Sequence, residues 1–227
     1  MVREYSPQRH LPPLENGDRL TRPEFERRYA AAPHIKKAEL IEGIVYVASP
    51  LRHEQHGKPH SRVITWLGVY QSFTPGVDLS DAPTVRLDLD NEPQPDVVLF
   101  IEPDAGGQTR LSSDGYIEGS PELIVEIAAS SAAIDTGSKK QVYRRNGVLE
   151  YVIWQSYENK IEWFCLIDGD YRLLSPGADG IIRSGVFPGL WLAVEALLNN
   201  QMVRVLEVVQ AGLKSPEHNA FVQQLKK

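Results

Sequence analysis

Two periods of apolar residues run through this chain, and each predicts a different kind of element. Residues 60–73 carry apolar side chains at helical spacing, and Pro75-Gly76 ends that predicted helix. Residues 83–89 alternate between apolar and polar positions, which predicts a half-buried strand. Residues 96–101 and 122–128 are apolar on both faces, which is typical of the central strands of a sheet.

Weaker signals place the other elements around these. Thr21 with Pro23 in the following turn opens a helix that ends before Pro33, and Glu42-Gly43 joins two short strands within 38–48. Further helices are expected at 135–146, 193–198, 200–212 and 216–225, further strands at 149–155, 160–167 and 171–174, and a long surface loop at 102–120. This order predicts an α+β fold with a central mixed sheet flanked by helices and a C-terminal helical extension.

The composition narrows the class of protein. Of the 227 residues, 42% are hydrophobic, which is enough for a packed core. The single cysteine excludes an intramolecular disulfide and a cysteine-based zinc cluster. No apolar stretch approaches the ~20 residues of a membrane helix, and the polar start of the chain lacks the apolar run of a secretory signal. We therefore expect a cytoplasmic protein without a membrane partner.

The net charge of −6 is unevenly distributed. Residues 38–135 hold 16 acidic and five basic residues, whereas the segments on either side are slightly basic. This balance argues against a nucleic-acid binder of the high-pI kind. Clustered carboxylates can hold a metal ion or cover a solvated face, and charge alone does not separate these two uses.

Glu126 interrupts an otherwise apolar strand. A buried carboxylate is costly unless it is paired, hydrogen-bonded or bound to a metal. In strand geometry it shares one face with Glu122, Ile124 and Ala128. The alternatives to a functional role are a strand end that reaches solvent and a structural ion pair.

Asp96 and Lys139 are weaker signals by themselves. Asp96 follows Pro95 at the start of a strand, where a turn-closing aspartate is also common, and Lys139 follows Asp135 at a spacing that suits a surface ion pair. Together with Glu126 they predict two carboxylates on neighbouring strands with a lysine beside them. Such a group can bind Mg²⁺ through oxygen ligands, and the lysine can orient a water molecule or offset the charge that develops in phosphodiester hydrolysis.

The motifs around these residues resemble a known family. They are similar to those of a large family of bacterial proteins described as restriction-endonuclease-like, within the PD-(D/E)XK nuclease superfamily. The matching positions are Gln94-Pro95-Asp96, the run from Pro121 to Glu126, and Ser130-Ser131 followed by Asp135, Lys139, Tyr143, Gly147-Val148 and Glu150-Tyr151. The runs 39–43 and 49–60 also match. The resemblance covers about residues 36–167 and implies a restriction-endonuclease-like core.

The resemblance also implies roles for individual residues. Asp96 would be the aspartate of the Pro-Asp signature and Glu126 the second acid, and both would bind Mg²⁺ or Mn²⁺ together with the main-chain carbonyl of Ile127. The superfamily lysine belongs two residues after Glu126, where this chain has Ala128. In this family that lysine is thought to have moved to the following helix, where Lys139 matches.

The sequence does not decide the roles of two further groups of residues, one acidic and one of histidines. Glu39 and Glu42 are candidates for an additional acidic residue of the superfamily, and Glu39 ranks low because it falls in the predicted hairpin. His53, His56 and His60 are spaced to line one helical face and could bind a transition metal. The alternative is a helix start with solvated imidazoles, and either His56 or His60 matches the family's histidine.

The leading hypothesis is a metal-dependent endonuclease that cleaves DNA, with Asp96, Glu126 and Lys139 as catalytic residues. The alternatives are a catalytically inactive nuclease-fold protein that acts in binding or assembly, which the acidic balance favours, and a hydrolase of small phosphoesters. We expect a helical lead-in over 1–35, a nuclease-like core over 36–167, and an extension over 168–227 packed on the same domain. The aromatic side chains of the C-terminal part, Trp154, Trp163, Phe164, Phe187 and Trp191, predict a homodimer.

Overall fold

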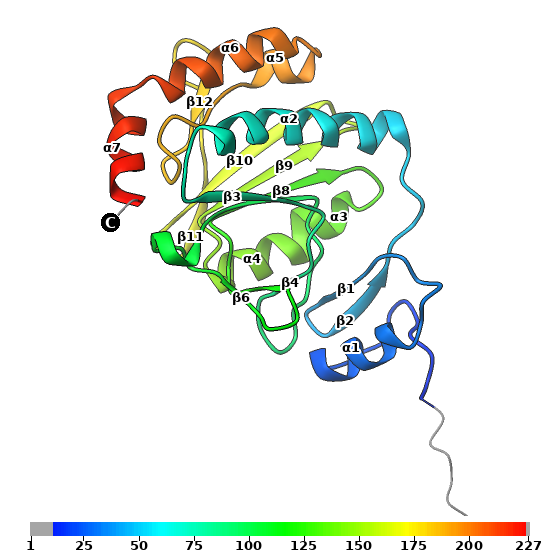
Figure 1. The fold of residues 1–227 in the computed structure, drawn as a ribbon. Coiled ribbons are helices and arrows are strands. Elements are labelled where there is room, and N and C mark those ends of the chain that lie inside the picture. The colour runs from blue at the N-terminus through cyan, green and yellow to red at the C-terminus, as the bar shows by residue number, and fades with distance from the viewer. Residues whose placement is uncertain (1–10, 226–227) are drawn as a thin grey trace, which may run out of the picture.

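A six-stranded mixed sheet lies at the centre of the structure (Figure 1). The structure is a computed structural model and describes residues 11–225. The strands follow one another across the sheet in the order β11 (Asp170–Leu173), β10 (Lys160–Ile167), β9 (Glu150–Gln155), β8 (Leu123–Ala128), β5 (Val97–Ile101) and β3 (Val77–Asp81). Strands β8 and β9 run parallel, and the other neighbouring pairs are antiparallel.

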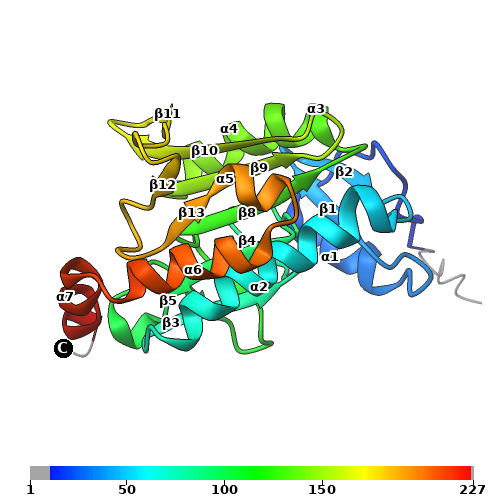
Figure 2. The same cartoon turned by 90° about the horizontal axis from the view of Figure 1, so that it is seen from above.

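Helices cover both faces of this sheet. Helix α2 (Lys58–Ser72) and helix α6 (Met202–Leu213) lie side by side over one face, as Figure 2 shows from above, and helix α4 (Lys140–Asn146) covers the other. The side chains of β5 and β8 alternate between the two layers because successive residues of a strand point to opposite faces. Val97, Leu99, Val125 and Ile127 pack with α2, whereas Val98, Phe100, Ile124 and Ala128 pack with α4.

The N-terminal part forms a smaller cluster beside the sheet. Helix α1 (Arg22–Ala30) packs on a hairpin made of β1 (Ala38–Ile41) and β2 (Ile44–Val47). The hairpin turns at Glu42-Gly43, where both residues have positive φ, 52° and 72°. A turn of this kind matches the right-handed twist of the strands.

The remaining elements are short or peripheral. They are the strands β4 (Val85–Arg86), β6 (Arg110–Leu111), β7 (Ile117–Glu118), β12 (Ile181–Arg183) and β13 (Trp191–Ala193), and the helices α3 (Ala132–Ile134), α5 (Val194–Leu198) and α7 (Pro216–Leu225). Two π-helical turns, η1 (His53–Gly57) and η3 (Asp135–Lys139), and one 3₁₀ turn, η2 (Pro103–Ala105), complete the list. No helix within residues 11–225 is long and apolar enough to cross a membrane.

The structure confirms the predicted α+β class, the hairpin at 38–48 and the central strands β5 and β8. The predicted strand at 83–89 is wrong beyond Val85–Arg86, because the chain turns there: the amide of Leu87 donates to the carbonyl of Asn91, whose side chain binds Asp88. The predicted loop at 102–120 contains β6 and β7, and β3 was not predicted. Strand β3 alternates apolar and polar residues for only five positions, which is a weak signal.

The aromatic side chains of the C-terminal part are covered by the chain itself. Trp154, Trp163 and Phe187 belong to the core between the sheet, α2 and α6, and Phe164 is buried on the α4 side. Trp191 is half-buried, and the Arg183 guanidinium lies over its ring. These side chains therefore give no reason to expect a dimer, and the homodimer stays a prediction.

Glu150, at the start of β9, holds the segment before β13 against the sheet. Its carboxylate accepts hydrogen bonds from Trp163 Nε1 (3.1 Å), Ser184 Oγ (2.8 Å) and the amide of Gly185 (2.9 Å), and a longer one from the amide of Val186 (3.3 Å). Burial raises the pKa of this carboxyl group against the effect of these donors. The group is surrounded by donors, so its role is structural.

We predict that Glu150→Gln destabilises the fold although it preserves the shape of the side chain. The new amide nitrogen would face N–H and O–H groups that need an acceptor, and a buried donor without a partner costs ~1–3 kcal/mol. Urea unfolding should show a loss of about 2 kcal/mol in the free energy of unfolding. A stability equal to that of the wild type would show that these hydrogen bonds contribute nothing net.

Candidate active site

The sheet register brings Asp96 and Glu126 together. Val97 pairs with Val125 and Val98 with Ile124 in the antiparallel ladder between β5 and β8, so Asp96, one residue before β5, lies opposite Glu126. Residues directly opposite each other have Cβ atoms ~4.5–5.5 Å apart and share a face of the sheet. Both carboxylates therefore lie on the face that α4 covers, as expected from the pattern of the two strands.

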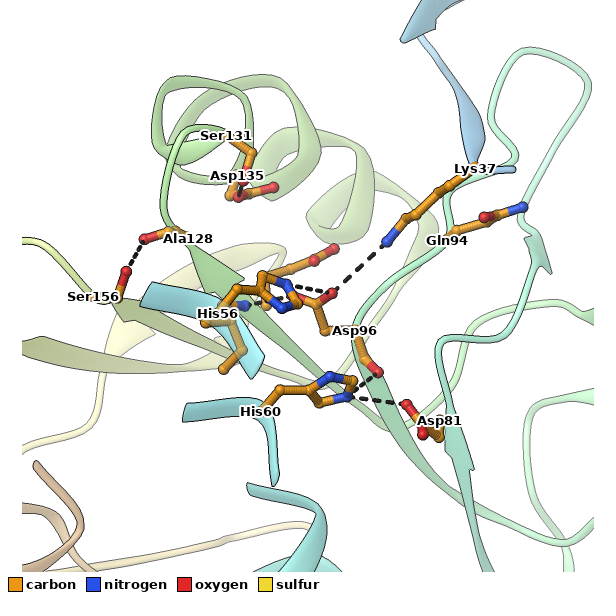
Figure 3. Close-up of polar contacts among 12 residues, drawn as sticks. Lys37, His56, His60, Asp81, Gln94, Asp96, Ala128, Ser131, Asp135 and Ser156 are labelled. Carbon is orange, nitrogen blue, oxygen red and sulfur yellow. Dashed lines mark hydrogen bonds and ion pairs between the residues drawn. The ribbon is translucent and has the colours of Figure 1, made fainter. Parts of the chain in front are cut away.

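Asp96 is buried and held by three partners. Its Oδ2 accepts a hydrogen bond from the amide of Ile127 at 2.7 Å, and its Oδ1 lies 3.0 Å from His56 Nε2 and 3.7 Å from Lys37 Nζ (Figure 3). Burial alone would raise the pKa of this carboxyl group. The His56 hydrogen bond, the charge of Lys37 and the Ile127 amide outweigh burial and lower the pKa to about 2, so Asp96 is ionised.

Glu126 has a different environment. Its Oε1 accepts hydrogen bonds from Lys139 Nζ at 3.0 Å and from the Tyr143 hydroxyl at 2.8 Å. Burial raises the pKa of Glu126 to about 8; Lys139 opposes this shift, while the nearby acids Asp135 and Asp96 add to it. The pKa values of two neighbouring carboxyl groups are thus shifted in opposite directions, which is an arrangement typical of functional sites.

Lys139 is the centre of a buried ion cluster. Its Nζ lies 2.8 Å from Glu39 Oε1, 3.0 Å from Glu126 Oε1 and 3.5 Å from Asp135 Oδ1, and its side chain is only 4% exposed. The three acids come from the hairpin, from β8 and from η3. The surface ion pair with Asp135 that the spacing also allowed is therefore not what forms, because the whole cluster is inside the protein.

A cavity of about 570 Å³ opens onto these groups. Asp96, Glu126 and Lys139 lie at its base, and Glu39 and Lys37 line it from the hairpin side. The segment from Ser49 to His56 and the turn after β8 at Ser130-Ser131 complete its walls, and Tyr157 lines it from the turn between β9 and β10. The predicted catalytic residues therefore share one cavity.

The three histidines have three different environments. His56, on η1, is buried against Asp96, which corrects the expectation of solvated imidazoles. His60, on α2, lies 3.1 Å from the main-chain carbonyl oxygen of Asp96 and 3.0 Å from Asp81 Oδ1 (Figure 3). His53 is exposed and lies beside Glu54. The three do not converge on one point, so the transition-metal alternative finds no support in their placement.

Glu39 is the residue that sequence reasoning ranked too low. The hairpin folds against the sheet, so Glu39 reaches Lys139 and also accepts a hydrogen bond from the amide of Gln94 at 2.7 Å. Glu42, the other candidate, lies at the hairpin turn and pairs with Arg145 on the surface. Ile127 does contact Asp96, but through its amide. A role for its carbonyl oxygen as a metal ligand stays a prediction.

The donor set at the base of the cavity suits a hard divalent cation. Three carboxyl groups that line the cavity, on Glu39, Asp96 and Glu126, face the ammonium groups of Lys37 and Lys139, and the buried Asp135, which does not line the cavity, also lies near Lys139. The buried Oδ1 of Asp135 has no hydrogen-bond partner. Residues 11–225 contain no group of three or more His, Cys, Asp or Glu side chains already arranged as a metal site. Mg²⁺ uses one or two carboxylates with several waters, so Asp96 and Glu126 fit it.

Comparison with known proteins agrees with this geometry. Residues 22–195 match the family Uma2, described as "Putative restriction endonuclease". The chain belongs to this family. A solved structure of a "putative nuclease belonging to DUF820" from Anabaena variabilis has the same fold, with a TM-score of 0.57 and 13% sequence identity over 76% of this chain and 96% of that one. No curated protein matches the chain significantly. The Uma2 match contains every residue of the ion cluster, since it spans the hairpin, β5, β8 and η3.

We predict that Glu126→Gln changes how stability depends on pH in the presence of a chelator. The folded-state pKa of Glu126, about 8, lies above its ordinary value of 4.5. Its contribution to stability is therefore complete below pH ~4.5 and is lost as the pH rises towards 8, by at most about 1.4 kcal/mol per pH unit. The variant should gain stability relative to the wild type across this range, as measured by urea unfolding at several pH values.

The exposed Glu158→Gln provides the matched control, because it changes the same group outside the cluster. It should show no pH-dependent difference from the wild type. Parallel curves for the wild type and Glu126→Gln would show that Glu126 is ionised throughout.

We predict that Lys139→Met destabilises the fold by ~3–5 kcal/mol, because it leaves buried carboxylates without their cation. Adding Glu126→Gln should recover part of this loss, since one of those carboxylates is removed. Lys58→Met is the control, because Lys58 pairs with Glu54 on the surface and exposed pairs contribute less than ~1 kcal/mol. Thermal and urea unfolding measure all four proteins. Equal effects of Lys139→Met and Lys58→Met would contradict a buried cluster.

Proposed function

We propose that this chain is a metal-dependent endonuclease that hydrolyses phosphodiester bonds in DNA, with Mg²⁺ or Mn²⁺ bound by Asp96 and Glu126. The observation that carries the proposal is the register of β5 and β8, which places these two carboxylates opposite each other at the base of a cavity with Lys139 beside them. Membership in a family described as restriction endonucleases supports the nuclease activity. The metal and the DNA substrate are part of the proposal.

Each residue of the site has a task in this proposal. Asp96 stays ionised because His56, Lys37 and the Ile127 amide stabilise its charge, so it can serve as a permanent anionic ligand. Tyr143 and Lys139 fix the position of Glu126 Oε1. The bound cation would lower the pKa of a water molecule and neutralise charge on the phosphate.

Lys139 is positioned to assist at the phosphate. Glu39 and Glu126 hold its ammonium group at the base of the cavity, where it can donate a hydrogen bond to a phosphate oxygen or to the attacking water. Preorganised donors of this kind stabilise charge that develops in the transition state. Burial makes the interaction stronger than it would be in water.

A binding protein without catalytic activity is the second candidate. The observation that favours it is that both oxygens of Asp96 already have protein partners, the Ile127 amide and His56. A metal ion bound through Oδ1 of Asp96 would have to share that oxygen with His56. A homodimer with two sites on one DNA molecule also stays a prediction.

We predict that Asp96→Asn abolishes Mg²⁺- or Mn²⁺-dependent cleavage of DNA, assayed on single-stranded and duplex substrates, while the fold persists. Asparagine can still accept the Ile127 hydrogen bond but lacks the charge that a hard divalent cation needs. The control is Asp168→Asn, an exposed aspartate at positive φ, where asparagine is well tolerated. It should cleave like the wild type.

Metal binding separates the two candidate functions. Titration calorimetry with Mn²⁺ should detect a bound ion in the wild type and in Asp168→Asn, and none in Asp96→Asn. Wild-type protein that binds neither Mn²⁺ nor Mg²⁺ and leaves DNA intact would favour the binding protein over the nuclease.

A further inference from the structure

We propose that the cavity admits single-stranded DNA and excludes the intact double helix, so that the substrate of this site is an unpaired strand or a single-stranded tail. The inference rests on the proposed function and adds the strand state of the substrate. It comes from the depth of the reactive groups, from two tyrosines in the walls of the cavity, and from the position of the basic residues.

The reactive groups are too deep for a double helix. Asp96, Glu126 and Lys139 are 4%, 2% and 3% exposed, and they lie at the base of a cavity of about 570 Å³. This volume is in the ~300–1,000 Å³ range of pockets that enclose small molecules. A scissile phosphate must reach the base of the cavity, and a paired backbone cannot bring it there because the second strand follows. A flexible single strand can enter without that obstacle.

Elements from four parts of the chain enclose the base. Figure 3 shows Asp96 between Lys37 and His56. The helical turn that carries Asp135 and Ser131 is drawn beside them. The hairpin is fixed in place by the contact between Glu39 and Lys139. The hairpin wall is therefore part of the packed structure, and duplex DNA could not displace it without breaking the ion cluster.

Two tyrosines line the cavity. Tyr46 on β2 lies directly opposite Glu39 on β1, so its ring is on the hairpin face that carries the site. Tyr157 lies in the turn between β9 and β10 and is 58% exposed. Unpaired bases stack on aromatic side chains, whereas bases in a duplex already stack on each other. The exposed ring of Tyr157 and the half-buried ring of Tyr46 beside the proposed phosphate site therefore favour an unpaired strand.

Basic residues mark the path of the strand. Lys37 and the exposed Arg52 line the cavity of a protein whose overall net charge is −6. A groove that follows a single strand combines positive charge with aromatic rings, and both are present here on the same cavity.

The experiment uses the full chain and three labelled DNAs of one sequence: an unstructured 30-nucleotide strand, the blunt duplex, and the duplex with a single-stranded tail. With Mn²⁺ or Mg²⁺, we expect cleavage of the single strand and of the tail, with cuts mapped to unpaired positions, and at least tenfold slower cleavage of the blunt duplex. Equal cleavage of the blunt duplex would overturn the inference and leave the nuclease proposal standing.

Variants test the binding path. Tyr157→Ala should weaken binding of the single strand, measured by fluorescence anisotropy, by about five- to hundredfold, the range that the loss of one stacked base gives. Phe73→Ala is the matched control, because Phe73 is 61% exposed but does not line the cavity, and it should bind like the wild type. Arg52→Ala should lower the slope of log K against log salt concentration by ~0.7.

The outcomes separate the two proposals. If no DNA is cleaved with either metal, the proposed function fails, and the anisotropy measurements alone decide the inference. Tighter binding of the single strand than of the duplex, lost in Tyr157→Ala and kept in Phe73→Ala, would then still support it. Equal binding of both DNAs, or equal effects of the two variants, would overturn it.

Discussion

The buried ammonium group of Lys139 holds the functional half of this molecule together. It joins the hairpin through Glu39, the central sheet through Glu126, and its own helical segment through Asp135. Glu39 is far from Glu126 and Asp135 in the sequence, so this contact joins the hairpin to the sheet. A buried charge that lacks its partner is costly, so each element is held where it completes the cluster. The hairpin wall of the cavity is therefore held partly by this side chain and partly by main-chain hydrogen bonds between Leu40 and Glu92.

The two central carboxyl groups have different surroundings, and their pKa values are shifted in opposite directions. Asp96 has its own set of donors and remains ionised, with a pKa of about 2. Burial raises the pKa of Glu126 to about 8, and Lys139, which Glu126 shares with two other acids, opposes this shift only in part. A protein that needed only stability would not place these carboxyl groups together, because a well-packed apolar core is as stable or more so. The arrangement is compatible with the proposed binding of a divalent cation by Asp96 and Glu126.

The sequence predicted the strands that position this site better than it predicted the site itself. The runs over β5 and β8 are apolar on both faces, so their central place in the sheet could be inferred, and Glu126 stood out because it interrupts such a run. Asp96 and Lys139 were weak signals by themselves that gained meaning beside Glu126, and the family resemblance then implied their roles. Glu39 and His56 were missed or misjudged because their burial depends on how the hairpin and η1 pack on the sheet. No local pattern encodes that packing: the hairpin looks the same whether its polar face meets solvent or a lysine.

Glu150 shows that a residue in a matching motif can have a purely structural role. It belongs to the same run of matching positions as Lys139 and Tyr143, and it is a buried acid on a central strand, yet donors from β10 and from the segment before β13 surround it. What separates it from Glu126 is the chemistry of its neighbours. The partners of Glu150 are neutral N–H and O–H groups from the protein interior, whereas Glu126 lines a cavity with a lysine and further acids around it. A buried carboxylate in a motif therefore points to catalysis only when it opens onto space that a substrate can enter.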